Sequence, residues 1–147
     1  MFKRMALSAC LLGSCGWCLA VVARVDSAEP APLESTFHPV ASLDSLMHGQ
    51  EHEFKAIRKM LKHTEDKHRM KRIFRGAELV AEFANVNLHH KHKDKPDYVA
   101  WATTLRATAL ELAAEAKKRA GADEARMKSL FDKLHATCDA CHDKYKD

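Results

Sequence analysis

Two cysteines and a histidine stand close together near the end of the 147-residue chain, in the run Cys138-Asp139-Ala140-Cys141-His142. On a helix the two thiols lie about one turn apart, a spacing that lets them form thioether bonds to the two vinyl groups of a haem. The histidine that follows directly is then placed to ligate the iron from one side. The C-x-x-C-H run therefore predicts one covalently attached haem c, with His142 as the proximal iron ligand.

Two other chemistries use the same residues, and both suit the sequence less well. His135 lies one turn before Cys138, so His135, Cys138, Cys141 and His142 offer a zinc ligand set. Ligands this close on one continuous helix do not readily surround an ion tetrahedrally, which disfavours zinc. A thioredoxin-like dithiol requires a strand–helix–strand context that the sequence lacks. A helical bundle that carries the motif by chance is the remaining alternative.

Other histidines gather at two places in the sequence and are expected to face solvent. His48 and His52 are one helical turn apart, which is a chelating arrangement, but they fall off the predicted apolar face of their helix. His89, His90 and His92 stand in a basic loop that offers ligands to a transition metal. We expect these loop side chains to be solvated instead.

Composition and charge exclude several classes of function. Residues 1–28 carry three of the chain's cations and one carboxylate, so a formal net charge of +4 for the whole chain becomes +2 without them. A net charge this small does not indicate a nucleic-acid-binding protein. No Ser/His/Asp set, phosphate-binding loop or paired-carboxylate pattern stands out, so we do not expect an enzyme. Only five glycines and four prolines occur, and Ala, Leu, Lys and Glu dominate the second half, which favours long helices.

The N-terminus has the pattern of an export signal. Lys3 and Arg4 precede the uncharged apolar segment 5–22, and cleavage is compatible with the sequences that end at Ala23 or Ala28. Two alternatives stay open: a lipoprotein box ending at Cys15, which would leave that cysteine acylated, and an uncleaved anchor. We read the cysteines at this end as signal sequence rather than a redox site; they are Cys10, Cys15 and Cys18.

The chain is thus expected to comprise a signal peptide or lipoprotein signal over residues 1–28, a flexible tether over 29–38, and one domain over 39–147. Export agrees with the motif, because c-type haem is attached outside the cytoplasm. The predicted location is periplasmic, and the predicted membrane contact is limited to a lipid anchor.

Apolar residues at three- and four-residue spacing predict four helices in the domain. The first two helices cover about 40–62 and 67–88. The third begins at Pro96, a residue favoured in the first turn, and ends at Gly121. The fourth begins after Asp123, which is its expected N-cap. Short connections imply antiparallel neighbours, so the expected fold is an all-α, up-and-down four-helix bundle with covalent haem on its C-terminal helix. In the first helix, the predicted inner stripe consists of Val40, Leu43, Met47, Phe54, Ile57 and Leu61.

Four helices with C-x-x-C-H on the last one resemble a class II c-type cytochrome, the cytochrome c′ and cytochrome c-556 family. The resemblance covers 39–147, and the tail is specific, since Cys138 to Lys146 fits the family's C-x-x-C-H-x-x-aromatic-basic ending. It implies that Cys138 and Cys141 hold the haem, that His142 is the proximal ligand, and that Lys146 lies near the proximal face. The alternative for Lys146 is an ordinary cation at a helix C-terminus.

The resemblance also assigns the other side of the haem to the first helix. It implies that Met47 faces the sixth iron position and that Phe54 packs on the haem. Low-spin members fill the sixth position with a methionine that aligns nearer Leu43 than Met47, so Met47 is expected not to ligate. Many members have an arginine toward a haem propionate where this chain has Leu43, which leaves the propionate partner open.

Two functions follow from the resemblance as expectations. The first is single-electron transfer between redox partner proteins of the periplasm. The alternative is a five-coordinate haem module that binds small gases such as nitric oxide or carbon monoxide. Homodimers are common in the family, and the sequence alone leaves the oligomeric state open.

Overall fold

The structure is a computed structural model that describes residues 37–90 and 92–145. The predicted signal peptide, the lipoprotein box at Cys15, most of the tether and the predicted site residue Lys146 lie outside the described residues. The described residues belong to one compact unit. No helix within the described residues is long and apolar enough to cross a membrane.

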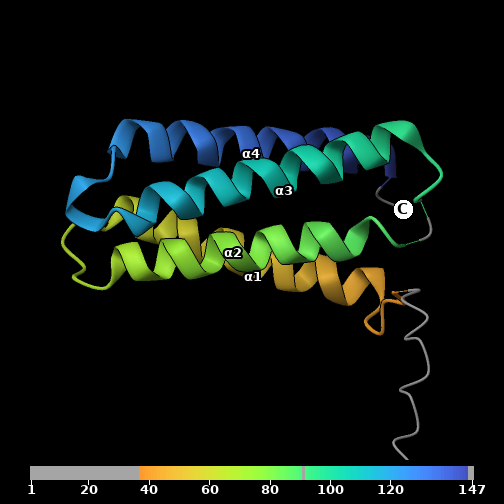
Figure 1. Ribbon diagram of the computed structural model, residues 1–147, viewed down its shortest axis with the longest axis horizontal. Coiled ribbons are helices and arrows are strands. Elements are labelled where there is room, and N and C mark those ends of the chain that lie inside the picture. The colour runs from red at the N-terminus through yellow and green to blue at the C-terminus, as the bar shows by residue number, and fades with distance from the viewer. Residues whose placement is uncertain (1–36, 91, 146–147) are drawn as a thin grey trace, which may run out of the picture. The chain divides into compact units, whose positions relative to one another are not determined.

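Four α-helices make up this unit, and the part of the chain that the structure describes contains no strand. Each helix runs antiparallel to the one before it (Figure 1), which confirms the predicted all-helical fold. The helices and one short 3₁₀ turn, η1, are α1 (Leu43–Lys62), α2 (Arg69–Asn87), α3 (Pro96–Lys117), η1 (Arg119–Gly121) and α4 (Glu124–Tyr145).

The helix starts follow from local capping chemistry. Ser42 accepts a hydrogen bond from the backbone N–H of Ser45 at 3.1 Å, so α1 begins at Leu43, three residues later than expected. Pro96 occupies the first turn of α3, as predicted, where its missing N–H leaves no bond unmade. Asp123 accepts from the N–H of Arg126 at 3.0 Å, which confirms it as the cap of α4.

The end of α3 differs from the prediction. Gly121 was expected to end the helix, but α3 stops at Lys117 and the left-handed conformation falls on Arg119, with φ of 57°. Gly121 instead lies in η1 without a positive φ, and an added Cβ there would meet no atom within 4 Å. The glycine is therefore not required by the backbone at its own position.

We expect Gly121→Ala to raise the free energy of unfolding by about 0.5 kcal/mol, because alanine restricts the unfolded chain without strain in the native state. Chemical denaturation measures the change. Gly76→Ala is the contrasting variant. Because its Cβ would lie only 3.0 Å from Cγ1 of Ile57 on α1, this substitution should not raise the free energy of unfolding. A destabilised Gly121→Ala would contradict the backbone described here.

The core is a continuous layer of aliphatic and small side chains from all four helices. Its fully buried members include Ile57, Ile73, Val80, Leu112, Met127 and Leu134. Alanines on α2 and α3 let those two helices approach closely; they include Ala77, Ala84, Ala109 and Ala116.

The predicted inner stripe of α1 was partly wrong. Val40 is fully exposed, and Leu43, Met47 and Leu61 are only half-buried. The side chains that α1 buries are Leu46, Gln50, Phe54, Ile57 and Met60. One face of the helix is buried in the core, and the adjacent face, which mixes apolar and polar side chains, lines a cavity; Phe54 lies where the two faces meet.

Helix packing is close between sequence neighbours and looser between the first and last helices. Backbone contacts join α1 to α2, α2 to α3, and α3 to α4. Across the remaining seam, the ring of Phe54 meets that of Phe131 with centroids 5.6 Å apart, and the Arg58 guanidinium lies 5.8 Å from the Phe131 ring centroid. The looser seam leaves room for the cavity described next.

Candidate functional site

A cavity of about 730 Å³ is lined by side chains of α1, α3 and α4, with Asn87 of α2 and His92 of the α2–α3 loop. This volume falls within the range of roughly 300–1,000 Å³ that is usual for small-molecule and cofactor pockets. Five of the six predicted site residues line it: Met47, Phe54, Cys138, Cys141 and His142. The sixth, Lys146, lies outside the described residues.

The wall of the cavity is apolar on α3, where it consists of Trp101, Ala102 and Leu105 beside Tyr98. On α1 the wall is mixed, because Met47 and Phe54 stand among polar and charged side chains such as Arg58. Such a lining offers an apolar surface to a flat ligand and polar groups to its polar edge.

The two cysteines are free thiols, half-buried on α4. Burial raises the pKa of Cys138 to about 12, and burial followed by the charge of Asp97 raises the pKa of Cys141. Both thiols are therefore protonated at neutral pH. A catalytic or redox-exchanging dithiol needs the opposite shift, so this environment opposes the thioredoxin-like alternative.

The imidazole of His142 is exposed on α4 and lines the cavity, and within the described residues it has no hydrogen-bond or ion-pair partner. His135 differs, because its Nδ1 pairs with Oδ2 of Asp139 one turn later at 2.9 Å. Across the described ranges, no three His, Cys, Asp or Glu side chains are grouped as metal ligands. Of the two histidines on this helix, His142 is the one whose nitrogens are unengaged.

Asp97, at the start of α3, ties down the turn of α4 that carries Cys141 and His142. Its Oδ1 accepts from Oη of Tyr145 at 2.7 Å and from the Tyr98 N–H at 3.0 Å, and its Oδ2 pairs with Nζ of Lys144. Hydrogen bonds from Lys144 and then Tyr145 lower the pKa of Asp97 to about 2 from an ordinary 3.8. The end of α4 is thus held in place by one ionised carboxylate.

This carboxylate predicts acid sensitivity of the same helix end. Because its pKa is lower in the folded state, its contribution to stability is complete above about pH 4 and is lost as pH falls toward 2. Asp97→Asn should lose less stability than the unchanged protein over that interval, as measured by thermal melts at each pH. Asp94→Asn in the neighbouring loop is the control. Parallel stability curves for Asp97→Asn and the unchanged protein would contradict the assignment.

Three residues that line this cavity each carry a buried polar atom with no hydrogen-bond partner in the described part of the chain: Asn87 Oδ1, His92 Nε2 and Tyr98 Oη. The His92 ring lies between two tyrosines, with centroids 5.3 Å from Tyr98 and 4.7 Å from Tyr145. A ligand with a polar edge would form hydrogen bonds with such atoms. Burial without a hydrogen bond costs free energy, because the atoms lose their bonds to water.

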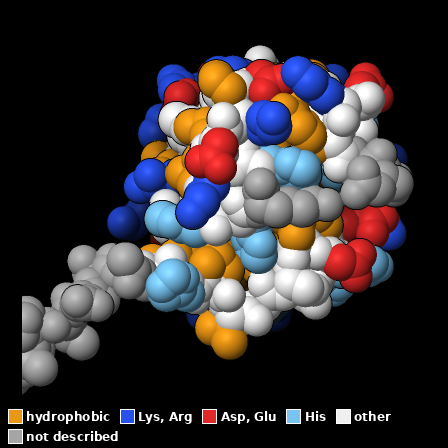
Figure 2. Space-filling model, turned by 90° about the vertical axis from the view of Figure 1, so that its right-hand side faces the viewer, with side chains coloured by type: hydrophobic (Ala, Val, Ile, Leu, Met, Phe, Trp, Pro, Cys, Tyr) orange, Lys and Arg blue, Asp and Glu red, His pale blue; other side chains and the backbone are white. Residues whose placement is uncertain are grey.

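The prediction that all the loop histidines face solvent was therefore wrong for His92, which is half-buried in the cavity wall. His90 is also half-buried, and only His89 is exposed, with its ring 4.8 Å from that of Phe37. Figure 2 views this end of the bundle and shows several histidine side chains at its surface. His48 and His52 are exposed as expected.

Comparisons with protein-family models, with curated proteins and with solved structures found no match for this chain. The function must therefore be inferred from the residues of the site and their arrangement.

Proposed function

We propose that this chain is a c-type haem protein that transfers single electrons, with the haem bound covalently to Cys138 and Cys141 and ligated by His142. The observation that carries the proposal is the common cavity. The C-x-x-C-H residues of α4 line the same cavity as Met47 and Phe54 of α1, the two residues that the resemblance assigns to the other side of the haem.

The cavity fits the group that the motif implies. Its apolar α3 wall, with Met47 and Phe54 of α1, suits a flat macrocycle, and its polar atoms without partners suit the carboxylate edge of one. Tyr98 Oη can donate a hydrogen bond to a propionate, and so can Nε2 of His92 when it carries the proton. These two side chains are our proposed propionate partners, in place of the arginine for which this chain has Leu43.

Each residue has a distinct task in this proposal. His142 holds the iron, and the thioethers of Cys138 and Cys141 fix the macrocycle along α4. Met47 and Phe54 cover the opposite face, and Asp97 fixes the helix end through Lys144 and Tyr145. When bound, the haem would supply the one-electron redox chemistry. The protein sets its potential through the axial ligand, burial and hydrogen bonds.

A second candidate function is reversible binding of nitric oxide or carbon monoxide at a five-coordinate iron. The apolar residues of the α1 wall support it, since Leu43, Met47 and Phe54 offer a distal side suited to small uncharged gases. In either case we propose that the chain acts in the periplasm after export. Its partners would be redox proteins, its membrane contact would be confined to a lipid anchor, and no catalytic residues are assigned.

The test is expression of the full chain together with haem-attachment machinery. Haem staining on a denaturing gel should mark the natural chain and leave the double variant Cys138→Ser, Cys141→Ser unmarked. Absorption spectra of the purified protein in its ferric and ferrous states then distinguish electron transfer from gas binding. Sharp ferrous α and β bands unmoved by carbon monoxide favour the electron carrier, and a high-spin spectrum that shifts favours gas binding. An unstained natural chain without a Soret band would end the haem proposal.

A further inference from the structure

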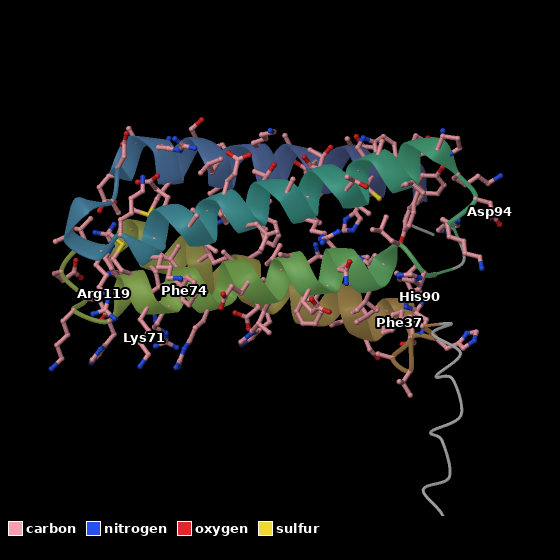
Figure 3. All side chains as sticks on the ribbon, in the orientation of Figure 1. Phe37, Lys71, Phe74, His90, Asp94 and Arg119 are labelled. Atoms are coloured by element: carbon pink, nitrogen blue, oxygen red, sulfur yellow. The ribbon has the colours of Figure 1, made fainter. Side chains whose placement is uncertain are left out.

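A second cavity, of about 550 Å³, lies at the opposite end of the bundle from the haem cavity. The α1–α2 loop, the first turn of α2, the segment around η1 and the first residue of α4 line it. Figure 3 shows Lys71 and Arg119 at this end, far from the labelled His90 and Asp94 at the other. Nothing in the proposed haem chemistry uses this second cavity.

Positive charge dominates the lining of this second cavity. Four permanent cations and one histidine face two carboxylates; the cations are Lys67, Arg69, Lys71 and Arg119, and the carboxylates are Asp66 and Glu124. Arg119 lies at a turn of the chain, where its backbone adopts a left-handed conformation with φ of 57°. An anion entering the cavity would therefore meet a net positive field.

The N-terminus of α2 adds backbone donors to the same cavity. Its cap residue, His68, makes no side-chain capping bond, and its first turn has no acidic side chain. The N–H groups of Arg69 and Arg72 reach the carbonyls of Asp66 and His68. Within the described residues, those of Met70 and Lys71 have no such acceptor. An uncapped 19-residue helix presents its positive end and unpaired N–H groups at this point.

The side chain of Arg69 supplies an independent observation. Arg69 is only 7% exposed, and its Nε is buried without a partner. Its Nη2 pairs with Glu124, so the ion pair occupies one part of the guanidinium and leaves Nε as an unmatched donor on a residue that lines the cavity. A guanidinium N–H donates a charge-assisted hydrogen bond to an oxyanion, so an oxyanion is a group that would satisfy this donor.

We propose that this cavity binds the phosphate group of a small molecule, or inorganic phosphate itself. The phosphate oxygens would accept from Nε of Arg69 and from the N–H groups of Met70 and Lys71, with Lys71 and Arg119 supplying charge at the rim. A phosphate with three acceptor oxygens matches this mixed set of side-chain and backbone donors.

The test is titration of the full chain at low salt, where charge interactions are least screened. Inorganic phosphate and glycerol 3-phosphate serve as the two probes. Calorimetry gives each affinity, and amide chemical shifts locate the contact. We expect the Met70 and Lys71 amides to move most. Tighter binding of glycerol 3-phosphate would assign the site to a phosphorylated small molecule, and equal or tighter binding of inorganic phosphate would assign it to the free ion.

Variants decide whether the named residues form the site. Lys71→Gln and Arg119→Gln should each weaken binding at least about threefold, and Arg69→Gln about tenfold, as expected for a lost charge-assisted hydrogen bond. Lys117→Gln removes an equal charge beside the cavity without lining it, and should change the affinity less than about twofold. If Arg69→Gln does not fold, the two exposed variants still test the proposal.

Two results would overturn this proposal. One is the absence of shifts at Met70 and Lys71 up to about 10 mM phosphate, which would mean that the site has no useful affinity. The other is an equal loss of binding in Lys117→Gln, which would mean a diffuse surface charge rather than a site. Haem content is measured by absorption in the same samples. A protein that holds haem but binds no phosphate would therefore contradict the phosphate proposal alone.

Discussion

His142→Ala is expected to leave the haem attached through its two thioethers and to remove the proximal nitrogen from the iron. The absorption spectrum should lose its normal ligand signature. The reduction potential should move by something on the order of 0.1 V, because axial ligands set haem potentials over about 0.8 V. Haem staining on a denaturing gel should persist, which separates a lost ligand from a lost cofactor.

The fold should tolerate this change, since His142 is exposed and makes no hydrogen bond or ion pair in the described part of the chain. Without haem, the free energy of unfolding should change by less than about 0.5 kcal/mol, as for other surface substitutions. His135→Ala is the matched control, because His135 also lines the cavity but pairs with Asp139. A normal spectrum in His142→Ala would refute the assignment of the proximal ligand.

Met47→Ala is expected to open the distal side of the haem and to speed carbon monoxide binding about tenfold or more, equivalent to lowering a steric barrier by about 1.4 kcal/mol. Met47 is half-buried and lines the cavity on α1, the helix opposite the one that carries the C-x-x-C-H run. Removing its thioether side chain leaves space where the sixth ligand would bind. Flash photolysis of the ferrous carbon monoxide complex measures the rate.

Met70→Ala is the control for this experiment, since Met70 is also half-buried but lines the cavity at the other end of the bundle. An unchanged rate in Met47→Ala would show that Met47 is not the gate. A natural protein that binds no carbon monoxide, together with a variant that does, would show that Met47 ligates the iron, contrary to our expectation.

Local sequence signals were sufficient to predict the four helices, because capping and proline placement act within a turn. Pro96 and Asp123 stand at helix starts as predicted, whereas Ser42, which caps α1, was not identified from the sequence. The interior of α1 was harder to predict, since apolar residues of this helix face both the core and the cavity. Periodicity alone could not assign Leu46 to the core and Met47 to the cavity, because the two residues are adjacent.

The polar rim of the cavity was missed for a different reason. Asn87 ends α2 and His92 belongs to the loop that follows, and nothing in their local sequence marks them as buried. The His92 ring packs against those of Tyr98 and Tyr145, which come from α3 and α4, and Nδ2 of Asn87 donates to Oε1 of Gln50 on α1 at 3.5 Å. A contact among three elements distant in the chain can be identified only once the bundle is assembled.

The looser seam between α1 and α4 also has a consequence for how the chain folds. Helices that pack mainly on their sequence neighbours form low-contact-order structure, which assembles quickly and without long loop closure. Joining the first helix to the last is the slow, non-local step that remains. A haem attached to α4 and covered by Met47 and Phe54 would contact both helices. The cofactor would then stabilise the packing of α1 against α4 as well as serve as the redox centre.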